Sequence, residues 1–425
     1  PPNVKGVYEI YLQDVDWVGK HPKKNRRMGA AEKQALCDYM MGRDGDMEAF
    51  FRFFQTPDLS INDLLMGEDF LDIVTEMYNE RYPNLQFVDF LWTIRSMYLP
   101  LFFTLHVKPP KADFFHCVAT GYAGLFGVGA KLLCGGKLLI SEHGIYTRER
   151  EEELIKAKWV QGLYKNVWIN YFGLMSQCAY KYADKVTSLF EDVRLLQVEL
   201  GCPAEKTLVT PNGINEQNYL NVPQKDADDP YINVGAVLRI APIKDVKTLI
   251  SAFAIAKQSV SNLKLWLMGP YDEKDSYAQE CFALVRALDV KDVVFTGRIK
   301  VTEYIGKMDF LMLTSISEGQ PLTILEGFAA KKPTIATNVG NCRGLILGES
   351  DTLGAAGMVL PVMGVSKIAD AIVTLANDEK LRVHMGEVGY ERLYAKYTLS
   401  RMRAQYTQLY SEMSSPEGRY KGCLE

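Results

Sequence analysis

Short apolar runs that alternate with helix-like stretches set the strongest limit on how this chain can fold. From residue 114 onward, runs of strand length such as 137–141, 207–210 and 308–315 are separated by longer stretches with helical periodicity. Strands buried in a parallel sheet have continuous apolar sequences, and each needs a crossover, usually a helix, before the next strand. The alternation therefore predicts an α/β protein built from parallel sheets.

Length and one linker divide this pattern in two. The chain has 425 residues, which predicts two domains of ordinary size. The Asp-rich stretch 223–230 is the clearest linker, and the alternation of strands and helices starts again after it. We therefore expect a first domain at residues 1–222, joined by a C-terminal helix at 399–425, and a second domain at 223–398. Ligands of such sheets bind beyond the carboxyl ends of the strands, so the cleft between two facing Rossmann-like domains is the expected site.

The first domain carries an additional helical segment. Residues 28–110 have helical periodicity and no strand signal, which predicts a helical insertion. Before it, residues 4–12 alternate well enough to predict one strand, and residues 20–27 are strongly basic. The basic stretch could face phosphates or an anionic surface, although a solvated linker explains it more simply.

Composition and charge exclude several classes of function. The formal net charge of -4 and the pI of about 5.9 argue against a nucleic-acid partner held by bulk electrostatics. No run approaches about 18 uncharged apolar residues, and the N-terminus lacks the pattern of a signal peptide. The eight cysteines are scattered without CxxC or metal-ligand spacing, which is typical of reduced, mostly buried thiols in the cytosol. We therefore expect a cytoplasmic protein, which could still dock peripherally at the inner membrane.

A glycine loop with two flanking carboxylates follows the apolar run at 308–315. Gly319 lies in the loop, and Pro321 has the fixed φ that suits a first helical position. The free N–H groups of such a helix start favour an anion or sugar hydroxyls. Glu318 and Glu326 flank these groups, and a carboxylate can accept two hydrogen bonds from neighbouring hydroxyls. The alternative is that a glutamate in a first helical turn only complements the helix dipole.

Other candidate ligand-binding residues also follow predicted strands. Arg239 and Lys244 come just after the first strand of the second domain and suit a pyrophosphate, although they could simply be surface cations. His143 and its neighbouring glycine follow a strand of the first domain, where the imidazole could donate a hydrogen bond or carry a proton. A core histidine is the alternative there. Gly269 and residues 297–299 also follow strands and could frame a nucleoside or merely form turns.

Several well-known motifs are missing from the sequence. It contains no GxxxxGK[ST] loop, no GxGxxG after a strand, no HExxH and no GxSxG. An Asp-x-Asp pair for a metal ion is not evident either. If phosphates bind, we therefore expect Arg239, Lys244 and helix N-termini to neutralise them without a bound metal.

Together these residues resemble the retaining glycosyltransferases of family four, which have the GT-B fold of two Rossmann-like domains. Residues 318–326 match the Glu-x7-Glu motif of that family in the form E-G-x-P-x-x-x-x-E, and residues 239–244 match its Arg-x4-Lys. Residues 211–214 match its P-N-G-[IV] turn. Residues 141–150 and 242–248 are more similar still to one branch, PelF, the glycosyltransferases of Pel exopolysaccharide synthesis, and so are residues 87–97.

The resemblance implies an enzyme that moves glucose, or a related hexose, from a UDP-sugar such as UDP-glucose to a glycan or polysaccharide acceptor. It implies retention of configuration, no metal and no other cofactor. An inner-membrane polysaccharide synthase complex is a further implied partner.

The resemblance also assigns roles to residues. His143 would lie near the anomeric carbon, Arg239 and Lys244 would stabilise the leaving diphosphate, and Glu318 would bind the donor sugar. Glu326 would hold the ribose hydroxyls. The remaining implied donor-binding residues, of which Arg298 and Ile299 would contact the base, are Gly269, Arg298, Ile299, Gly319, Gln320, Pro321, Leu322 and Thr323.

One departure from this branch keeps an alternative open. Its members begin with a strand and a glycine-rich loop, and nothing like it precedes Pro1, so we expect one βα unit of the first domain to be missing from this sequence. The alternative is a non-catalytic nucleotide-sugar-binding subunit of a polysaccharide synthesis complex. An epimerase or a phosphorylase fits less well, because the acid/base groups or the phosphate pocket that they need are not identifiable.

Overall fold

The computed structural model describes residues 3–11, 27–57, 59–349 and 351–414. The chain divides into two compact units between Val209 and Thr210 and again between Gln408 and Leu409. We call the part before Thr210 with the part after Gln408 the first unit, and the part between them the second unit.

These divisions differ from the expected ones at 222/223 and 398/399. Ile214, Tyr219 and Val222 all belong to a buried cluster of the second unit, so the residues after Val209 already pack there. Ile214 also forms a parallel β-bridge with Thr398. The Asp-rich stretch 223–230 therefore lies within the second unit and does not connect the two units.

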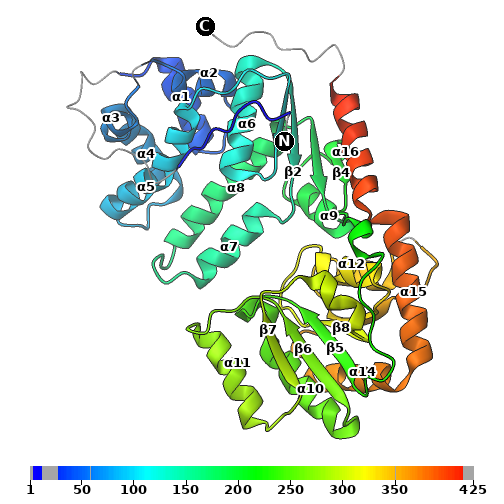
Figure 1. Ribbon diagram of the computed structural model, residues 1–425. Coiled ribbons are helices and arrows are strands. Elements are labelled where there is room, and N and C mark those ends of the chain that lie inside the picture. Colours follow the sequence, from blue (N-terminus) through cyan, green and yellow to red (C-terminus); the bar gives the residue numbers. More distant parts are fainter. Residues whose placement is uncertain (1–2, 12–26, 58, 350, 415–425) are drawn as a thin grey trace. The chain divides into compact units, whose positions relative to one another are not determined.

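The first unit contains a parallel sheet of the predicted kind. Its described residues form four strands in the order β1-β2-β3-β4. The strands are β1 (Phe114–Cys117), β2 (Lys137–Ser141), β3 (Lys185–Ser188) and β4 (Thr207–Val209). The connecting helices are α6 (Gly121–Cys134), α7 (Tyr146–Lys156), α8 (Tyr164–Tyr182) and α9 (Glu191–Glu199), as Figure 1 shows.

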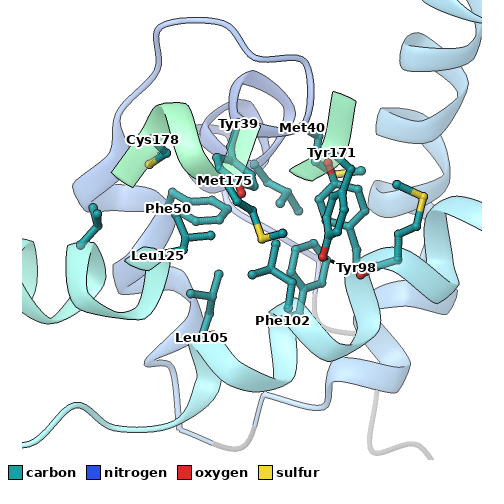
Figure 2. Packing of buried hydrophobic residues seen from close by; sticks show 14 of the residues in the cluster. Tyr39, Met40, Phe50, Tyr98, Phe102, Leu105, Leu125, Tyr171, Met175 and Cys178 are labelled. Atoms are coloured by element: carbon teal, nitrogen blue, oxygen red, sulfur yellow. Dashed lines mark hydrogen bonds between the residues drawn. The ribbon is translucent and has the colours of Figure 1, made fainter. Parts of the chain in front are cut away.

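The helical insertion expected at residues 28–110 is confirmed. It consists of α1 (Ala30–Met40), α2 (Met47–Phe54), α3 (Ile61–Met66), α4 (Glu68–Arg81) and α5 (Phe87–His106). Asp46 caps α2 by accepting a hydrogen bond from the Ala49 N–H at 3.0 Å. Aromatic rings then join the insertion to itself, where Phe54 packs against Phe102. They also join it to α8, where Tyr98 packs against Tyr171 (Figure 2).

Two expectations for the N-terminal residues have different outcomes. The predicted strand at 4–12 is wrong for residues 4–11, which form no strand and are exposed, because no neighbouring strand pairs with them. Residue 12 lies outside the described residues, and so does the basic stretch 20–27 except for Arg27.

The second unit contains the larger sheet, and its strand order locates the ligand edge. Its described residues form six parallel strands in the order β10-β9-β8-β5-β6-β7. The strands are β5 (Ile232–Val237), β6 (Leu263–Met268), β7 (Val293–Gly297), β8 (Phe310–Leu313), β9 (Thr334–Thr337) and β10 (Gly357–Leu360). This is the order of a doubly wound sheet, with its switch point between β5 and β8. The loops that follow β5 and β8 therefore lie side by side where ligands of such sheets bind.

Helices cover both faces of this sheet. They are α10 (Val246–Ser259), α11 (Ser276–Ala287), α12 (Leu322–Ala329), α13 (Cys342–Leu347), α14 (Val365–Asn377) and α15 (Glu379–Lys396). Alternate residues of β8 point to opposite faces, so Phe310 and Met312 pack with α10 and α14. Leu311 and Leu313 pack with α12, α13 and α15.

A buried ion pair ties α15 to the segment that follows α13. Arg392 is fully buried, and its guanidinium contacts the Asp351 carboxylate twice at 2.9 Å. It also donates to the Leu345 and Ile346 carbonyls at 3.1 and 2.9 Å. The Arg392 guanidinium lowers the pKa of Asp351 to about 2.

The last helix, α16 (Leu399–Met413), begins in the second unit and ends in the first. Leu409 and Met413 are buried, and the Tyr410 ring packs edge-on against Phe114 of β1 with centroids 5.2 Å apart. Among the described residues, no helix is long and apolar enough to cross a membrane.

The cysteines partly meet the expectation of reduced, buried thiols. Within the described residues, six cysteines are free thiols, and five of these are buried. Cys134 is disulfide-bonded, so the expectation is wrong at that position.

Candidate functional site

The site centres on Glu318 in the loop between β8 and α12. Its carboxylate forms an ion pair with the Lys244 ammonium and accepts a hydrogen bond from the Ser315 hydroxyl. The Glu318 and Lys244 side chains are only 11% and 26% exposed. Sequence reasoning identified both charges but not their pairing, nor the supporting role of Ser315.

Hydrogen bonds between the β5 and β8 loops bring Lys244 to Glu318. The Thr314 hydroxyl, just after β8, donates to the carbonyls of Lys244 and Asp245 at 3.1 and 3.2 Å. The Ile316 N–H donates to the Ile243 carbonyl at 2.9 Å. Both loops follow strands that are neighbours at the switch point, so the sheet order itself positions this contact.

A left-handed residue turns the β5 loop into α10. The chain passes through the short 3-10 helix η3 (Pro242–Lys244) to Asp245, which has φ 44° and ψ 52°. Asp245 also caps α10, since its carboxylate accepts from the Thr248 N–H at 3.4 Å. An aspartate tolerates this conformation better than most residues, which explains how Lys244 can sit immediately before a helix.

Arg239 and Gly269 lie at the same edge of the sheet. Arg239 is exposed, and it forms no ion pair within the described residues. At Gly269 a Cβ atom would lie 1.9 Å from the Leu238 carbonyl oxygen. The space above this glycine is therefore filled by the backbone that leads into Arg239.

The start of α12 is built from the remaining residues of the glycine loop. Pro321, with φ −71° and ψ 117°, is the N-cap and not the first helical residue, so Leu322 and Thr323 open the helix. Gln320 is buried, and its side-chain carbonyl accepts a hydrogen bond from the Asn212 N–H at 2.7 Å. The amide nitrogen of the Gln320 side chain has no hydrogen-bond partner within the described residues.

The turn after β9 holds the loop from its other side. The Asn341 N–H donates to the Gly319 carbonyl at 2.9 Å. Gly340 has a φ of 49°, and a Cβ there would lie 2.2 Å from the Glu318 carbonyl oxygen. A glycine is therefore required at this position for the loop to keep its conformation.

Glu326 lies one turn into α12 and contacts a residue that sequence reasoning missed. The hydroxyl of Tyr219, in the short helix η2 (Glu216–Tyr219), donates a hydrogen bond to its carboxylate. Burial raises the pKa of Glu326, and the Tyr219 hydrogen bond opposes this rise. Tyr219 follows the P-N-G turn at 211–214, which was the one available signal that this segment belongs to the site.

Arg298 and Ile299 follow β7, two strands away from β5 at the same edge. Arg298 is exposed, and Ile299 is half-buried against the cluster that contains α12. Their position agrees with the carboxyl edge expected from the sequence, and their role as base contacts stays a prediction.

His143 belongs to the first unit, where it follows β2 and is exposed. Its neighbour Glu142 is buried and accepts hydrogen bonds from Thr120, Tyr180 and Gln197 at 2.9, 2.5 and 3.0 Å. Burial raises the pKa of Glu142. This carboxylate fixes the backbone that presents His143, and sequence reasoning did not single it out.

Structural interactions account for His116, which we expected to be structural. Its ring nitrogens bond with the hydroxyls of Ser141 and Tyr410, both at 2.8 Å. Burial and the nearby His143 lower the pKa of His116. Within the described residues, no group of three His, Cys, Asp or Glu side chains could hold a metal ion.

Comparisons with known proteins agree with this geometry. Residues 231–378 match the family described as "Glycosyl transferases group 1", and residues 1–205 match a domain of unknown function, DUF3492. Residues 231–378 of the second unit are thus similar to group 1 glycosyltransferases, and the chain has the GT-B type of fold with two Rossmann-like units.

Individual known proteins are only distantly similar to this chain. The chain is 30% identical over 173 residues to N-acetyl-alpha-D-glucosaminyl L-malate synthase of Bacillus anthracis, covering 40% of this chain and 43% of the relative. It is 24% identical to the capsular polysaccharide biosynthesis glycosyltransferase CapM of Staphylococcus aureus, covering 52% and 55%. The chain thus spans about half the length of these curated relatives. The structure of HepE from Anabaena in complex with UDP has a TM-score of 0.58 and 19% identity, covering 71% and 79%.

Proposed function

We propose that this chain is a retaining glycosyltransferase that transfers glucose, or a related hexose, from a UDP-sugar to a glycan or polysaccharide acceptor. The observation that carries the proposal is the Lys244–Glu318 pair beside the start of α12. A cation, a carboxylate and free helix N–H groups meet there at the switch point of the sheet. These three elements suit a sugar diphosphate. The cation and the helix N–H groups can bind its negatively charged phosphates, and the carboxylate can accept hydrogen bonds from its sugar hydroxyls.

The relatives support both halves of the substrate pair. HepE was solved with UDP, and also with UDP-glucose at a TM-score of 0.55 and 19% identity. The name of CapM connects it with capsular polysaccharide biosynthesis. The Pel type of exopolysaccharide is proposed on the resemblance of residues 141–150 and 242–248. The proposal includes a cytoplasmic site of action and an inner-membrane synthase complex as partner.

In the proposed reaction, the bond between the anomeric carbon and the phosphate oxygen breaks while the acceptor hydroxyl oxygen bonds to the same face of that carbon. The hydroxyl proton passes to the departing phosphate oxygen, so no enzyme nucleophile is needed. Lys244 and Arg239 would stabilise the charge that grows on the diphosphate, which is where preorganised cations lower a barrier most. His143 would act from the first unit, near the anomeric carbon.

The Glu318 carboxylate forms an ion pair with the Lys244 ammonium. Entry of a diphosphate would draw Lys244 toward the phosphates and release a Glu318 oxygen for the sugar hydroxyls. The ion pair would thus keep the charges of both groups balanced until the donor arrives. Glu326 would meanwhile bind the ribose hydroxyls from the next turn of α12.

The first test is donor binding. UDP, UDP-glucose, ADP-glucose and GDP-mannose would be compared by thermal shift, because a ligand at 100 times its Kd stabilises a protein by about 2.7 kcal/mol. A stabilisation confined to the uridine compounds is expected. Calorimetry would then compare Glu326→Ala with Glu387→Ala, a change at an exposed glutamate of the same unit. An unchanged UDP affinity in Glu326→Ala would remove the ribose role.

The second test separates an enzyme from a non-catalytic nucleotide-sugar-binding subunit. An enzyme releases UDP slowly from UDP-glucose in water, and the proposal expects the same rate with and without a chelator. Lys244→Ala should lower this rate more than it lowers UDP-glucose affinity. Tight donor binding with no UDP release, in the presence of glycan acceptors as well, would favour the binding subunit.

A further inference from the structure

The connection between α7 and α8 exposes an unusual group of apolar side chains. Ile155, Trp159 and Leu163 are 61%, 71% and 54% exposed. Figure 1 shows that this connection lies at the end of a helical hairpin that extends away from the sheet of the first unit. We call residues 155–163 the hairpin tip. Several large apolar groups gathered on one projecting segment mark an interaction site more often than chance exposure does.

The tip is amphipathic in its own right. Leu154 and Val160 point inward and are buried, which anchors the segment to the first unit. Trp159 packs edge-on against Trp168 of α8 with ring centroids 5.5 Å apart, so its ring is held in a fixed orientation while it is exposed. The outward apolar groups are therefore presented by an ordered framework.

Positive charge accompanies these apolar groups. Residues 154–165 contain three lysines and no acidic residue. Lys156 and Lys158 are exposed, and Lys165 supports the tip by donating to the Ile155 carbonyl at 2.6 Å. Lys156 forms an ion pair with Glu152 of α7 at 3.5 Å. The tip itself therefore combines an apolar surface with positive charge.

We propose that the hairpin tip docks this protein on an anionic lipid bilayer. Ile155, Trp159 and Leu163 would enter the boundary between headgroups and acyl chains, and Lys156 and Lys158 would remain at the phosphates. Tryptophan and lysine are the side chains that suit this boundary, because each has an apolar body and a polar end. A projecting segment with exposed apolar side chains can enter the interfacial region of a bilayer.

This attachment is independent of the proposed transfer reaction and would be peripheral. Three inserted side chains give a binding strength comparable with a single acyl anchor, about 10⁴ M⁻¹. The association is thus expected to be reversible, and sensitive to salt through the lysines.

The test is cosedimentation of the full chain with vesicles of phosphatidylcholine alone, or with vesicles in which about a third of the lipid is phosphatidylglycerol, whose negative charge attracts lysine. Binding to the anionic vesicles is expected. The triple change Ile155→Ser, Trp159→Ser, Leu163→Ser should reduce it at least about tenfold. The double change Lys156→Gln, Lys158→Gln should weaken binding to anionic vesicles and flatten its salt dependence.

A matched control is Trp92→Ser, which removes another exposed tryptophan of the first unit. It should leave vesicle binding unchanged. Thermal unfolding should show that every variant is folded at the assay temperature, because the substituted side chains are largely exposed and the triple change removes only the Trp159–Trp168 contact. The proposal is overturned if the wild type does not sediment with anionic vesicles, or if Trp92→Ser reduces binding as much as the triple change does.

Discussion

Replacing Glu318 by glutamine would test the pairing at the centre of the site. Glutamine keeps the size of the side chain and can still accept a hydrogen bond from Ser315, but it cannot neutralise Lys244. The substitution therefore separates two effects that an alanine would mix. One is the stability that the ion pair supplies, and the other is the competition between Glu318 and a diphosphate for the same ammonium.

The expected loss of stability follows from how deeply the Lys244–Glu318 ion pair is buried. Two unit charges about 4 Å apart attract by about 4 kcal/mol at an effective dielectric constant of about 20, before desolvation is subtracted. Exposed pairs contribute a net ~0–1 kcal/mol, and breaking a fully buried pair costs ~3–5 kcal/mol. With side chains 11% and 26% exposed, this pair lies between these limits, so we expect a loss of about 2 kcal/mol. For a unit of this size that corresponds to a Tm lower by roughly 4–8 °C.

In Glu318→Gln, UDP affinity should not fall, whereas turnover should. With Lys244 unpaired, the variant should bind UDP at least as tightly as the wild type does. UDP release from UDP-glucose should fall by roughly 10–100-fold, since a hydrogen bond to a charged group contributes about 1.5–3 kcal/mol. Calorimetry with UDP and a coupled assay of UDP release would measure the two quantities.

The control is Glu387→Gln, which breaks the Lys331–Glu387 pair of 2.9 Å, whose side chains are 49% and 47% exposed. It should change the free energy of unfolding by less than about 0.5 kcal/mol. A UDP affinity more than about tenfold weaker in Glu318→Gln would refute the reasoning, because Glu318 would then be needed to position Lys244 for the phosphates.

Three further predictions concern the second unit. Burial raises the pKa of Glu326 above the ordinary glutamate value, so UDP should bind with full affinity above that raised pKa and more weakly as the pH drops through it. Calorimetry at several pH values should show this loss of affinity in the wild type and not in Glu326→Gln. Asp351→Asn should destabilise the unit by about 3 kcal/mol, because it leaves the buried Arg392 without its carboxylate. The folded-state pKa of Asp351 is lowered, so the deficit should be complete above about pH 4, and it should shrink as the pH falls toward 2, in unfolding curves of wild type and variant. Gly340→Ala should displace the Glu318 loop and weaken UDP-glucose binding more than the Asp351 change does, as titration calorimetry would measure.

The sequence predicted the architecture well because the architecture depends on patterns. Continuous apolar runs such as Phe310–Leu313 can only be buried strands here, and alternating residues of that strand do reach the two faces of the sheet. The prediction of a strand at 4–12 was wrong because alternation of apolar and polar residues does not show whether a partner strand is present. The domain boundary at 222/223 failed because an Asp-rich composition indicates exposure, and an exposed stretch need not connect two units.

The site was predicted in its charges but not in its contacts. Glu318, Lys244 and Arg239 follow strand ends, which spacing alone can reveal. Their pairing depends on Asp245 adopting a left-handed conformation, and on two loops brought together by strand order. Tyr219 is missed because its partner Glu326 lies more than a hundred residues away, and single-sequence patterns contain no information on such contacts.

The passage of α16 from the second unit into the first has a consequence for synthesis on the ribosome. Tyr410, whose ring packs on Phe114 and whose hydroxyl bonds His116, is made only after the whole of residues 210–408. At about 5–20 residues per second, the first unit must wait roughly 10–40 s for this last contact. During that interval the second unit emerges and can fold while β1 of the first unit still lacks its contacts with Tyr410. Chaperone dependence during translation is therefore expected to be greatest for the unit that is made first.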